Sequence, residues 1–194
     1  MPRSMIRQLL TGLRVTAVLT VLLGLAYPLA VTAVSQVAFR SRAEGSLVEK
    51  GGQAVGSSLL GQRFTGPTYF HPRPSAAGDG YDPLASGGSN LGPSNQKLLD
   101  AVAARVAAVR EENGVAPDAA VPIDAVTASA SGLDPQISVA YARLQASRVA
   151  EARSLPIERV LRLVDEHTQH RQWGFLGENG VNVLTLNLAL DEMG

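Results

Sequence analysis

The stretch Val15–Phe39, VTAVLTVLLGLAYPLAVTAVSQVAF, contains no charged residue and decides how the whole chain is organised. A helix rises about 1.5 Å per residue, so about 20 residues cross the roughly 30 Å hydrocarbon core of a bilayer. The stretch is longer than that and predicts one transmembrane helix. Pro28 should kink or interrupt this helix, because proline removes a backbone donor.

The same region can also be interpreted as a secretory signal peptide. Arg3, Arg7 and Arg14 would form its basic part, and Val31-Thr32-Ala33 would be its cleavage site. The apolar stretch continues past that site as far as Phe39, which favours a retained anchor.

Three basic residues precede the span and three follow it, so the positive-inside rule gives a tie. A short N-terminal arm stays inside more readily than a long domain does. We therefore expect a cytoplasmic arm at residues 1–14, a transmembrane helix at 15–39, and an extracytoplasmic domain at 40–194.

Charge and cysteine content exclude several classes of function. Three of the 17 basic residues precede residue 40, so residues 40–194 carry 14 basic and 17 acidic residues, a net charge near −3. This argues against a nucleic-acid binder, which needs a concentrated basic face. The chain has no cysteine, which excludes disulfides, thiolate catalysis and cysteine zinc sites.

The first part of the predicted domain combines a hairpin with a long loop. Ser46–Leu60 predicts a β-hairpin, because Gly51-Gly52 can supply the positive φ of a tight turn. Gly61–Gly92 is rich in Gly, Pro, Ser and aromatic residues and fits neither a helical nor an alternating pattern. A loop of this length inside a compact domain is usually functional.

The rest of the domain predicts three helices. The first spans about 94–113, with Ser94 as N-cap and Gly114 as its stop. The second should begin after Asp134-Pro135, and the third at Pro156.

Two strands complete the prediction. We expect a short strand at Ala125–Ala130, and another at Val181–Leu190, where apolar and polar residues alternate. The fold class is therefore mixed α/β: one N-terminal transmembrane helix followed by a small extracytoplasmic domain.

Candidate chemistry is sparse. His167 and His170 could hold a metal from one helix face, but a solvated helix end is the preferred interpretation, and His71 has no obvious partner. The sequence contains neither a Gly-x-Ser-x-Gly elbow nor a Walker A motif. We therefore predict no catalytic residue and no metal site.

The segment Ser86–Asn90 (SGGSN) is the most suggestive short motif. Its backbone amides could form an anion-binding nest, or the segment could be a tight turn or interface loop. It resembles the signature loop of ABC-type ATPases, but those proteins also need the missing Walker A motif.

Four ordered segments carry a family resemblance: GSSLLGQRFTGPTYFHPRPS (Gly56–Ser75), ASGGSNLGPSN (Ala85–Asn95), VTASASGLDPQIS (Val126–Ser138) and VNVLTLNLAL (Val181–Leu190). With the anchor, they resemble the C subunit of the bacterial Kdp potassium-transporting P-type ATPase, the KdpC family. The resemblance implies a non-catalytic accessory subunit in the bacterial inner membrane. Its implied partners are a channel-like potassium-binding subunit, a P-type ATPase subunit and a small membrane peptide.

The resemblance also implies how the pump divides its work. The ATPase subunit would use ATP and Mg²⁺, K⁺ would be the transported ion, and no cofactor would bind this chain tightly. The C subunit would stabilise the assembly and act as a catalytic chaperone that raises the ATP affinity of the ATPase subunit.

The family motifs carry over onto fifteen positions, plus a glutamine associated with nucleotide binding, Gln145. The motif positions are Phe64, Tyr69, Phe70, Arg73, Pro74, Ser75, Ser86, Gly87, Gly88, Ser89, Asn90, Ser129, Gly132, Leu133 and Asp134. An extracytoplasmic domain would not meet cytoplasmic ATP. We therefore expect the aromatic loop, through Tyr69 and Arg73, to be an assembly surface, although Phe64 and Phe70 could equally be core residues.

Two rival functions remain at this stage. One is a stand-alone anchored protein that captures a solute in the aromatic loop. The other is an anchored hydrolase that uses His71 or His167, and it is the weaker because no nucleophile–base pair is visible.

Overall fold

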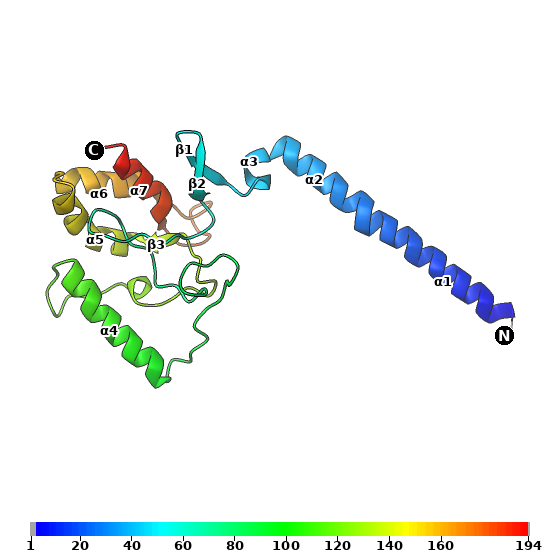
Figure 1. The fold of residues 1–194 in the computed structure, drawn as a ribbon, viewed down its shortest axis with the longest axis horizontal. Coiled ribbons are helices and arrows are strands. Elements are labelled where there is room, and N and C mark those ends of the chain that lie inside the picture. Colours follow the sequence, from blue (N-terminus) through cyan, green and yellow to red (C-terminus); the bar gives the residue numbers. More distant parts are fainter. Residues whose placement is uncertain (1–2, 194) are drawn as a thin grey trace. The chain divides into compact units, whose positions relative to one another are not determined.

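The computed structural model describes residues 3–193 and divides into two compact units (Figure 1). One unit ends at Leu47 and the other begins at Val48. The predicted fold class is confirmed, because a single long apolar helix is followed by a small region of mixed helices and strands.

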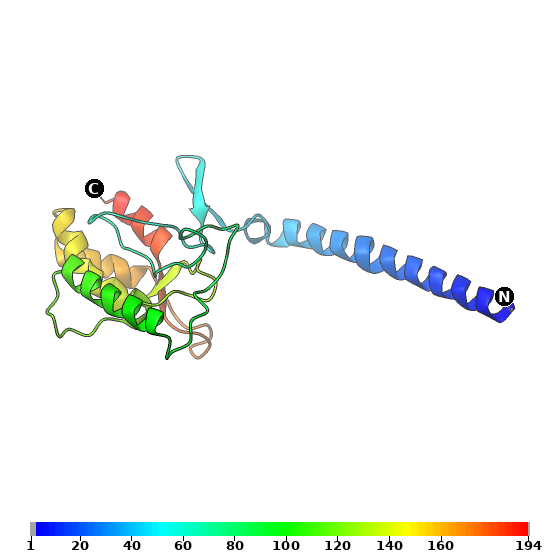
Figure 2. The same cartoon turned by 60° about the horizontal axis from the view of Figure 1, so that its bottom comes forward.

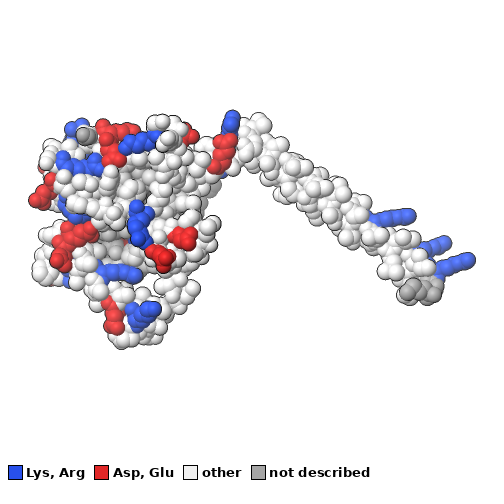
Figure 3. Space-filling view, viewed as in Figure 1, with Lys and Arg blue, Asp and Glu red and all other residues white. Residues whose placement is uncertain are grey.

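The first unit is built on one long helix. It consists of α1 (Arg3–Val21), the π-helical turn η1 (Leu22–Ala26) and α2 (Tyr27–Ala38), and a short helix, α3 (Arg40–Ala43), follows. The helix is long and apolar enough to cross a membrane once. Figure 3 shows basic side chains near its N-terminal end and an uncharged surface along most of the remainder.

Pro28 widens the helix and does not end it. Proline lacks an N–H, and its ring clashes with the carbonyl of the residue four positions earlier, here Gly24. Gly24 lies in the π-turn η1, where the wider winding relieves that clash. The irregularity predicted at Pro28 is therefore a π-turn just before it.

The second unit contains two small sheets. Strands β1 (Leu47–Lys50) and β2 (Gln53–Ser57) form the first, and Gly51 and Gly52 join them at φ +61° and +79°. The predicted hairpin is thereby confirmed. The second sheet has the order β3-β5-β4 and is antiparallel, with β3 at Gln136–Ser138, β4 at Thr168–Gln169 and β5 at Gly180–Asn182.

Four helices surround the core of the second unit. They are α4 (Gln96–Glu112), α5 (Val139–Ala152), α6 (Ile157–Glu166) and α7 (Val183–Asp191). In both ribbon views α5 and α6 lie between α4 and α7 (Figures 1 and 2). The core draws fully buried side chains from several elements, among them Phe70, Val149, Val164 and Leu186.

The second predicted helix begins later than expected. Residues after Asp134-Pro135 first form β3, and α5 begins at Val139 because Ser138 Oγ caps it by accepting from Tyr141 N–H at 3.0 Å. The Asp134 carboxylate instead accepts from the Gln136 N–H at 3.0 Å, at the start of β3, and from Arg73 at 2.9 Å.

The predicted strand at Val181–Leu190 is mostly wrong, because only its first two residues belong to β5. Asn182 caps α7 by accepting from Thr185 N–H at 3.1 Å. The buried residues of α7 include Val183, Leu186 and Leu190, which have helical spacing. A short apolar-rich stretch fits both the period of a strand and that of a helix, and here the N-cap at Asn182 favours the helix.

Three smaller predictions are corrected. Ala125–Ala130 forms no strand: the 3₁₀ turn η2 (Ile123–Ala125) ends there and irregular chain follows. The N-cap of α4 is Asn95, not Ser94, while Gly114 at φ +60° ends that helix as predicted. For α6 the apolar pattern predicts Ile157, Val160, Leu161 and Val164 as the inward residues; Val160 and Val164 are fully buried, but Ile157 is exposed and Leu163 is buried instead.

Candidate functional site

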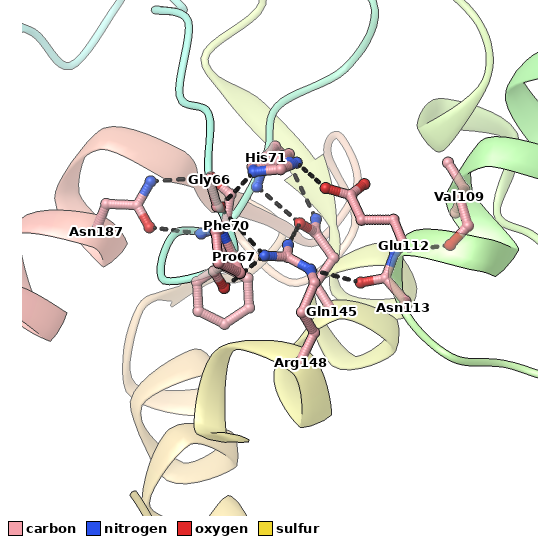
Figure 4. Close-up of polar contacts among 10 residues, drawn as sticks. All are labelled: Gly66, Pro67, Phe70, His71, Val109, Glu112, Asn113, Gln145, Arg148 and Asn187. Carbon is pink, nitrogen blue, oxygen red and sulfur yellow. Dashed lines mark hydrogen bonds and ion pairs between the residues drawn. The ribbon is translucent and has the colours of Figure 1, made fainter. Parts of the chain in front are cut away.

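Two buried amides hold the long loop Gly61–Gly92, which contains neither helix nor strand. Phe70 is fully buried; its N–H donates to Asn187 Oδ1 at 2.9 Å, and its carbonyl accepts from Asn187 Nδ2 at 2.9 Å (Figure 4). Gln145 repeats this pattern at His71, with distances of 2.7 and 3.0 Å. Helices α7 and α5 thus pair with the loop as a neighbouring strand would.

Arg148 connects the loop to two helices. Its guanidinium donates to Asn113 Oδ1 at 3.0 Å, to the Pro67 carbonyl at 2.7 Å and to Gln145 Oε1 at 2.8 Å (Figure 4). Burial lowers the pKa of Arg148, and the nearby charge of Glu112 opposes that shift. The Gln145 side chain is fully buried, and its amide is engaged by His71 and Arg148.

His71 has a partner that the sequence did not reveal. Its Nδ1 lies 2.8 Å from Glu112 Oε1, at the end of α4, and its Nε2 lies 2.8 Å from the Gly66 carbonyl. Both nitrogens therefore face acceptors, and both bonds form together only when the ring carries two protons. Forty residues separate the pair in sequence, so no local pattern indicated it.

The other two histidines do not share a helix. His167 caps the end of α6 and pairs through Nδ1 with the Leu163 carbonyl at 2.9 Å, while His170 lies beyond β4. Within residues 3–193, no group of three His, Asp or Glu side chains is placed to hold a metal ion.

Arg153 fixes the aromatic end of the loop. Its guanidinium lies 5.0 Å from the ring centroid of Tyr69, which in turn packs on Phe64 at 5.7 Å between centroids. Arg153 also donates to the Thr68 carbonyl at 2.7 Å and to Asp191 at 2.8 Å. Burial tends to raise the pKa of Asp191, but hydrogen bonds from Arg153 and Lys50 outweigh it and hold that pKa below its usual value.

Three sequence motifs meet in a second region, which we term the motif cluster: residues 73–75, 86–90 and 129–134. Arg73 pairs with Asp134 at 2.9 Å, and Ser75 Oγ donates to the Gly132 carbonyl at 2.6 Å. Ser86 Oγ and the Gly87 N–H both donate to the Ser131 carbonyl, at 3.0 and 2.8 Å. Segments far apart in sequence thus form one hydrogen-bonded unit.

Glycine is required where these motifs cross. Gly132 has φ +66°, and a Cβ there would lie 2.7 Å from both Ala77 N and the Gly87 carbonyl oxygen. A Cβ on Gly88 would lie 3.0 Å from the Ala130 carbonyl oxygen. The Gly87 N–H is already bonded to the Ser131 carbonyl, so this amide of the Ser86–Asn90 segment is used within the domain.

The remaining motif residues differ in exposure. Ser129 and Leu133 are buried, Pro74 is half-buried, and Ser89 and Asn90 are exposed. The side chain of Leu84, in the turn at residues 82–85 just before the Ser86–Asn90 segment, is 96% exposed. Its backbone is nevertheless fixed, because Leu84 N–H donates to Asp82 Oδ1 at 2.9 Å.

A cleft of about 550 Å³ is lined mostly by residues of the loop, and Glu112 of α4, Ala125 of η2 and Tyr141 of α5 complete its wall. Burial is the main reason that the pKa of Tyr81 lies far above its ordinary value and that of Tyr141 rises to about 12, so both remain neutral phenols. Ser75 lines the cleft, but its Oγ bonds to Gly132 and not to His71. Among the residues described here, the cleft contains no bonded nucleophile–base pair.

Comparison with known proteins gives one consistent result. A family model described as "KdpC: K+-transporting ATPase, c chain" matches residues 9–192. A "Potassium-transporting ATPase KdpC subunit" of Mycobacterium tuberculosis (strain H37Rv) is 59% identical over 187 residues, which is 96% of this chain and 99% of that protein. Similarly named proteins of Rhodospirillum rubrum and Koribacter versatilis are 57% and 51% identical, and the alignments cover 97% and 95% of this chain and 97% and 94% of theirs.

Proposed function

The chain belongs to the KdpC family of potassium-transporting ATPase subunits, and from this premise we propose that it is a non-catalytic assembly subunit. Membership makes it an accessory part of a K⁺ pump. In our proposal a channel-like potassium-binding subunit, a P-type ATPase subunit and a small membrane peptide are its partners. ATP and Mg²⁺ act on the ATPase subunit, and K⁺ is the transported ion.

The motif cluster is the observation that carries this proposal. Its three segments are bonded to one another and hold a turn whose Leu84 is almost fully exposed. An exposed apolar side chain on a hydrogen-bonded backbone is suited to docking, because little conformational entropy is lost on binding. Tyr69 and Arg73 are less suited, since both are half-buried and bonded or packed within the domain.

We also propose that this subunit supports ATP use through assembly and not through direct contact with a nucleotide. Gln145 is the residue that the family resemblance associates with nucleotides. Its fully buried amide is occupied by the backbone of His71 and by Arg148. A nucleotide would have to break these bonds before it could reach the side chain.

Copurification tests the assembly role. Leu84→Asp should leave the melting of the chain unchanged, because the side chain makes no buried contact. If docking buries the Leu84 side chain, its loss and the introduced charge should together weaken docking by about 2 kcal/mol or more, roughly 30-fold. Pull-down of the other pump subunits and K⁺-stimulated ATP hydrolysis should fall together.

Leu99→Asp is the matched control, since Leu99 is also exposed but lies on α4. It should leave both readouts unchanged. Normal copurification of Leu84→Asp would place the docking surface elsewhere. If the wild-type chain brought down no pump subunit at all, it would act alone, as an anchored solute-binding protein does.

We propose that the N-terminus faces the cytoplasm and that the domain lies outside the inner membrane. The short arm with Arg3, Arg7 and Arg14 motivates this orientation. In spheroplasts, external protease should digest the domain and leave a small fragment that carries an N-terminal tag. A domain cut only after lysis would reverse the orientation, and a mature chain without the tag would indicate a cleaved signal peptide.

A further inference from the structure

The connection between β4 and β5 exposes three large apolar side chains within four residues. We term Gln172–Leu176 the aromatic tip. The exposed fractions of Trp173, Phe175 and Leu176 are 84%, 69% and 44%. Nothing in the fold described above requires three adjacent large apolar side chains in water.

The aromatic tip is a defined turn. Gln172 N–H donates to the Leu176 carbonyl at 2.9 Å, and Leu176 N–H donates to the Gln172 carbonyl at 3.0 Å. Trp173 and Gly174 have φ +51° and +81°, the consecutive positive values of a tight hairpin turn. The rings of Trp173 and Phe175 lie 6.5 Å apart, so the turn presents both together.

We propose that the aromatic tip inserts into the headgroup region of the bilayer that holds the N-terminal helix, as a second membrane contact. Tryptophan favours this region, because its ring is apolar and its N–H still reaches water or lipid oxygens. Arg171 precedes the tip, where a cation can meet lipid phosphates, and Glu178 is the nearest following acid in sequence.

The tether makes this contact possible. Nine residues lie between the end of α2 at Ala38 and the start of the second unit at Val48, a span of at most roughly 35 Å. A unit of this size has a radius of gyration of roughly 15 Å. Much of its surface therefore remains within reach of the bilayer, at a high effective concentration.

The size of the tip favours lipid over a protein partner. A stable protein interface buries about 800 Å² on each side, from about 20–30 residues. The tip offers three apolar side chains on one turn, which is far less. Three such side chains are enough for a lipid contact when a helix already anchors the chain.

Trp173 is the only tryptophan in the chain, so its fluorescence reports on the tip alone. The full chain should be placed in nanodiscs with phospholipids brominated along their acyl chains. We expect bromine near the headgroup to quench most of the emission, bromine near the bilayer centre to quench little, and acrylamide to quench weakly. Emission unaffected by any brominated lipid, with full access to acrylamide, would overturn the proposal.

Variants and the assembled pump complete the test. The double variant Phe175→Ser with Leu176→Ser should lose most lipid quenching and keep its melting temperature, whereas Leu84→Ala should change neither. Undiminished quenching in the double variant would contradict insertion. Shielding from lipid and acrylamide that arises only with the other pump subunits would assign the tip to a protein partner. The inference rests on the anchor alone, so failure of the assembly role would leave it standing.

Discussion

Replacing Arg148 with methionine should lower the free energy of unfolding by about 3–5 kcal/mol, the range expected when one partner of a buried charged network is removed. Methionine retains much of the apolar volume and removes every donor. Asn113 Oδ1 and the Pro67 carbonyl would lose their bonds, and Gln145 Oε1 would lose one of two. Denaturant unfolding of the full chain in detergent, followed by circular dichroism, measures the loss.

Arg143→Met provides the matched control on the same helix. Arg143 pairs with Asp165 at 2.9 Å, but both side chains are more than half exposed. Exposed ion pairs contribute at most about 1 kcal/mol, so this variant should remain close to the wild type. Equal losses in the two variants would mean that the network around Arg148 is not what orders the loop.

Gly132→Ala should destabilise the chain by about 2–5 kcal/mol and should also abolish copurification. The left-handed backbone at φ +66° costs an alanine about 1–2 kcal/mol. The added Cβ would further contact backbone atoms of Ala77 and Gly87 at 2.7 Å, which adds about 1–3 kcal/mol of overpacking. Because the motif cluster must open to accept the methyl group, the turn that holds Leu84 should shift as well.

Gly114→Ala separates the cost of the left-handed backbone from the cost of steric contact with neighbouring atoms. Gly114 has a similar φ of +60°, but nothing lies within 4 Å of the position of a Cβ. This variant should lose only about 1–2 kcal/mol and keep its partners. If Gly132→Ala were no worse than Gly114→Ala, the contacts at the motif crossing would be looser than the structure indicates.

The sequence predicted those elements whose formation depends on residues close together in the chain. The uncharged stretch before Arg40 indicated the long helix, Gly51-Gly52 indicated the hairpin, and Gly114 indicated the end of α4. Each depends on residues that are neighbours in the chain. The strand predicted at Val181–Leu190 failed because the capping role of Asn182 competes with an alternating pattern.

Contacts between segments that are far apart in the chain could not be predicted from such local patterns. The family resemblance named Arg73, Ser75 and Gly132, but only the structure joins them into one cluster. Glu112 is an ordinary helix-end acid in the sequence, and its contact with His71 depends on how α4 packs. Composition gave no reason to expect that buried amides would hold an irregular loop.

Those amides also determine when the domain can fold during synthesis. Asn187 lies 117 residues after Phe70, and Gln145 lies 74 residues after His71. While the ribosome is still making α5, the loop that contains Phe70 has neither partner. It acquires its second partner only when the final helix emerges. A nascent chain therefore exposes its aromatic segment for most of translation. If translation terminates before α7, the Phe70 backbone lacks the Asn187 side chain that pairs with it, and the product is suited to quality-control proteases.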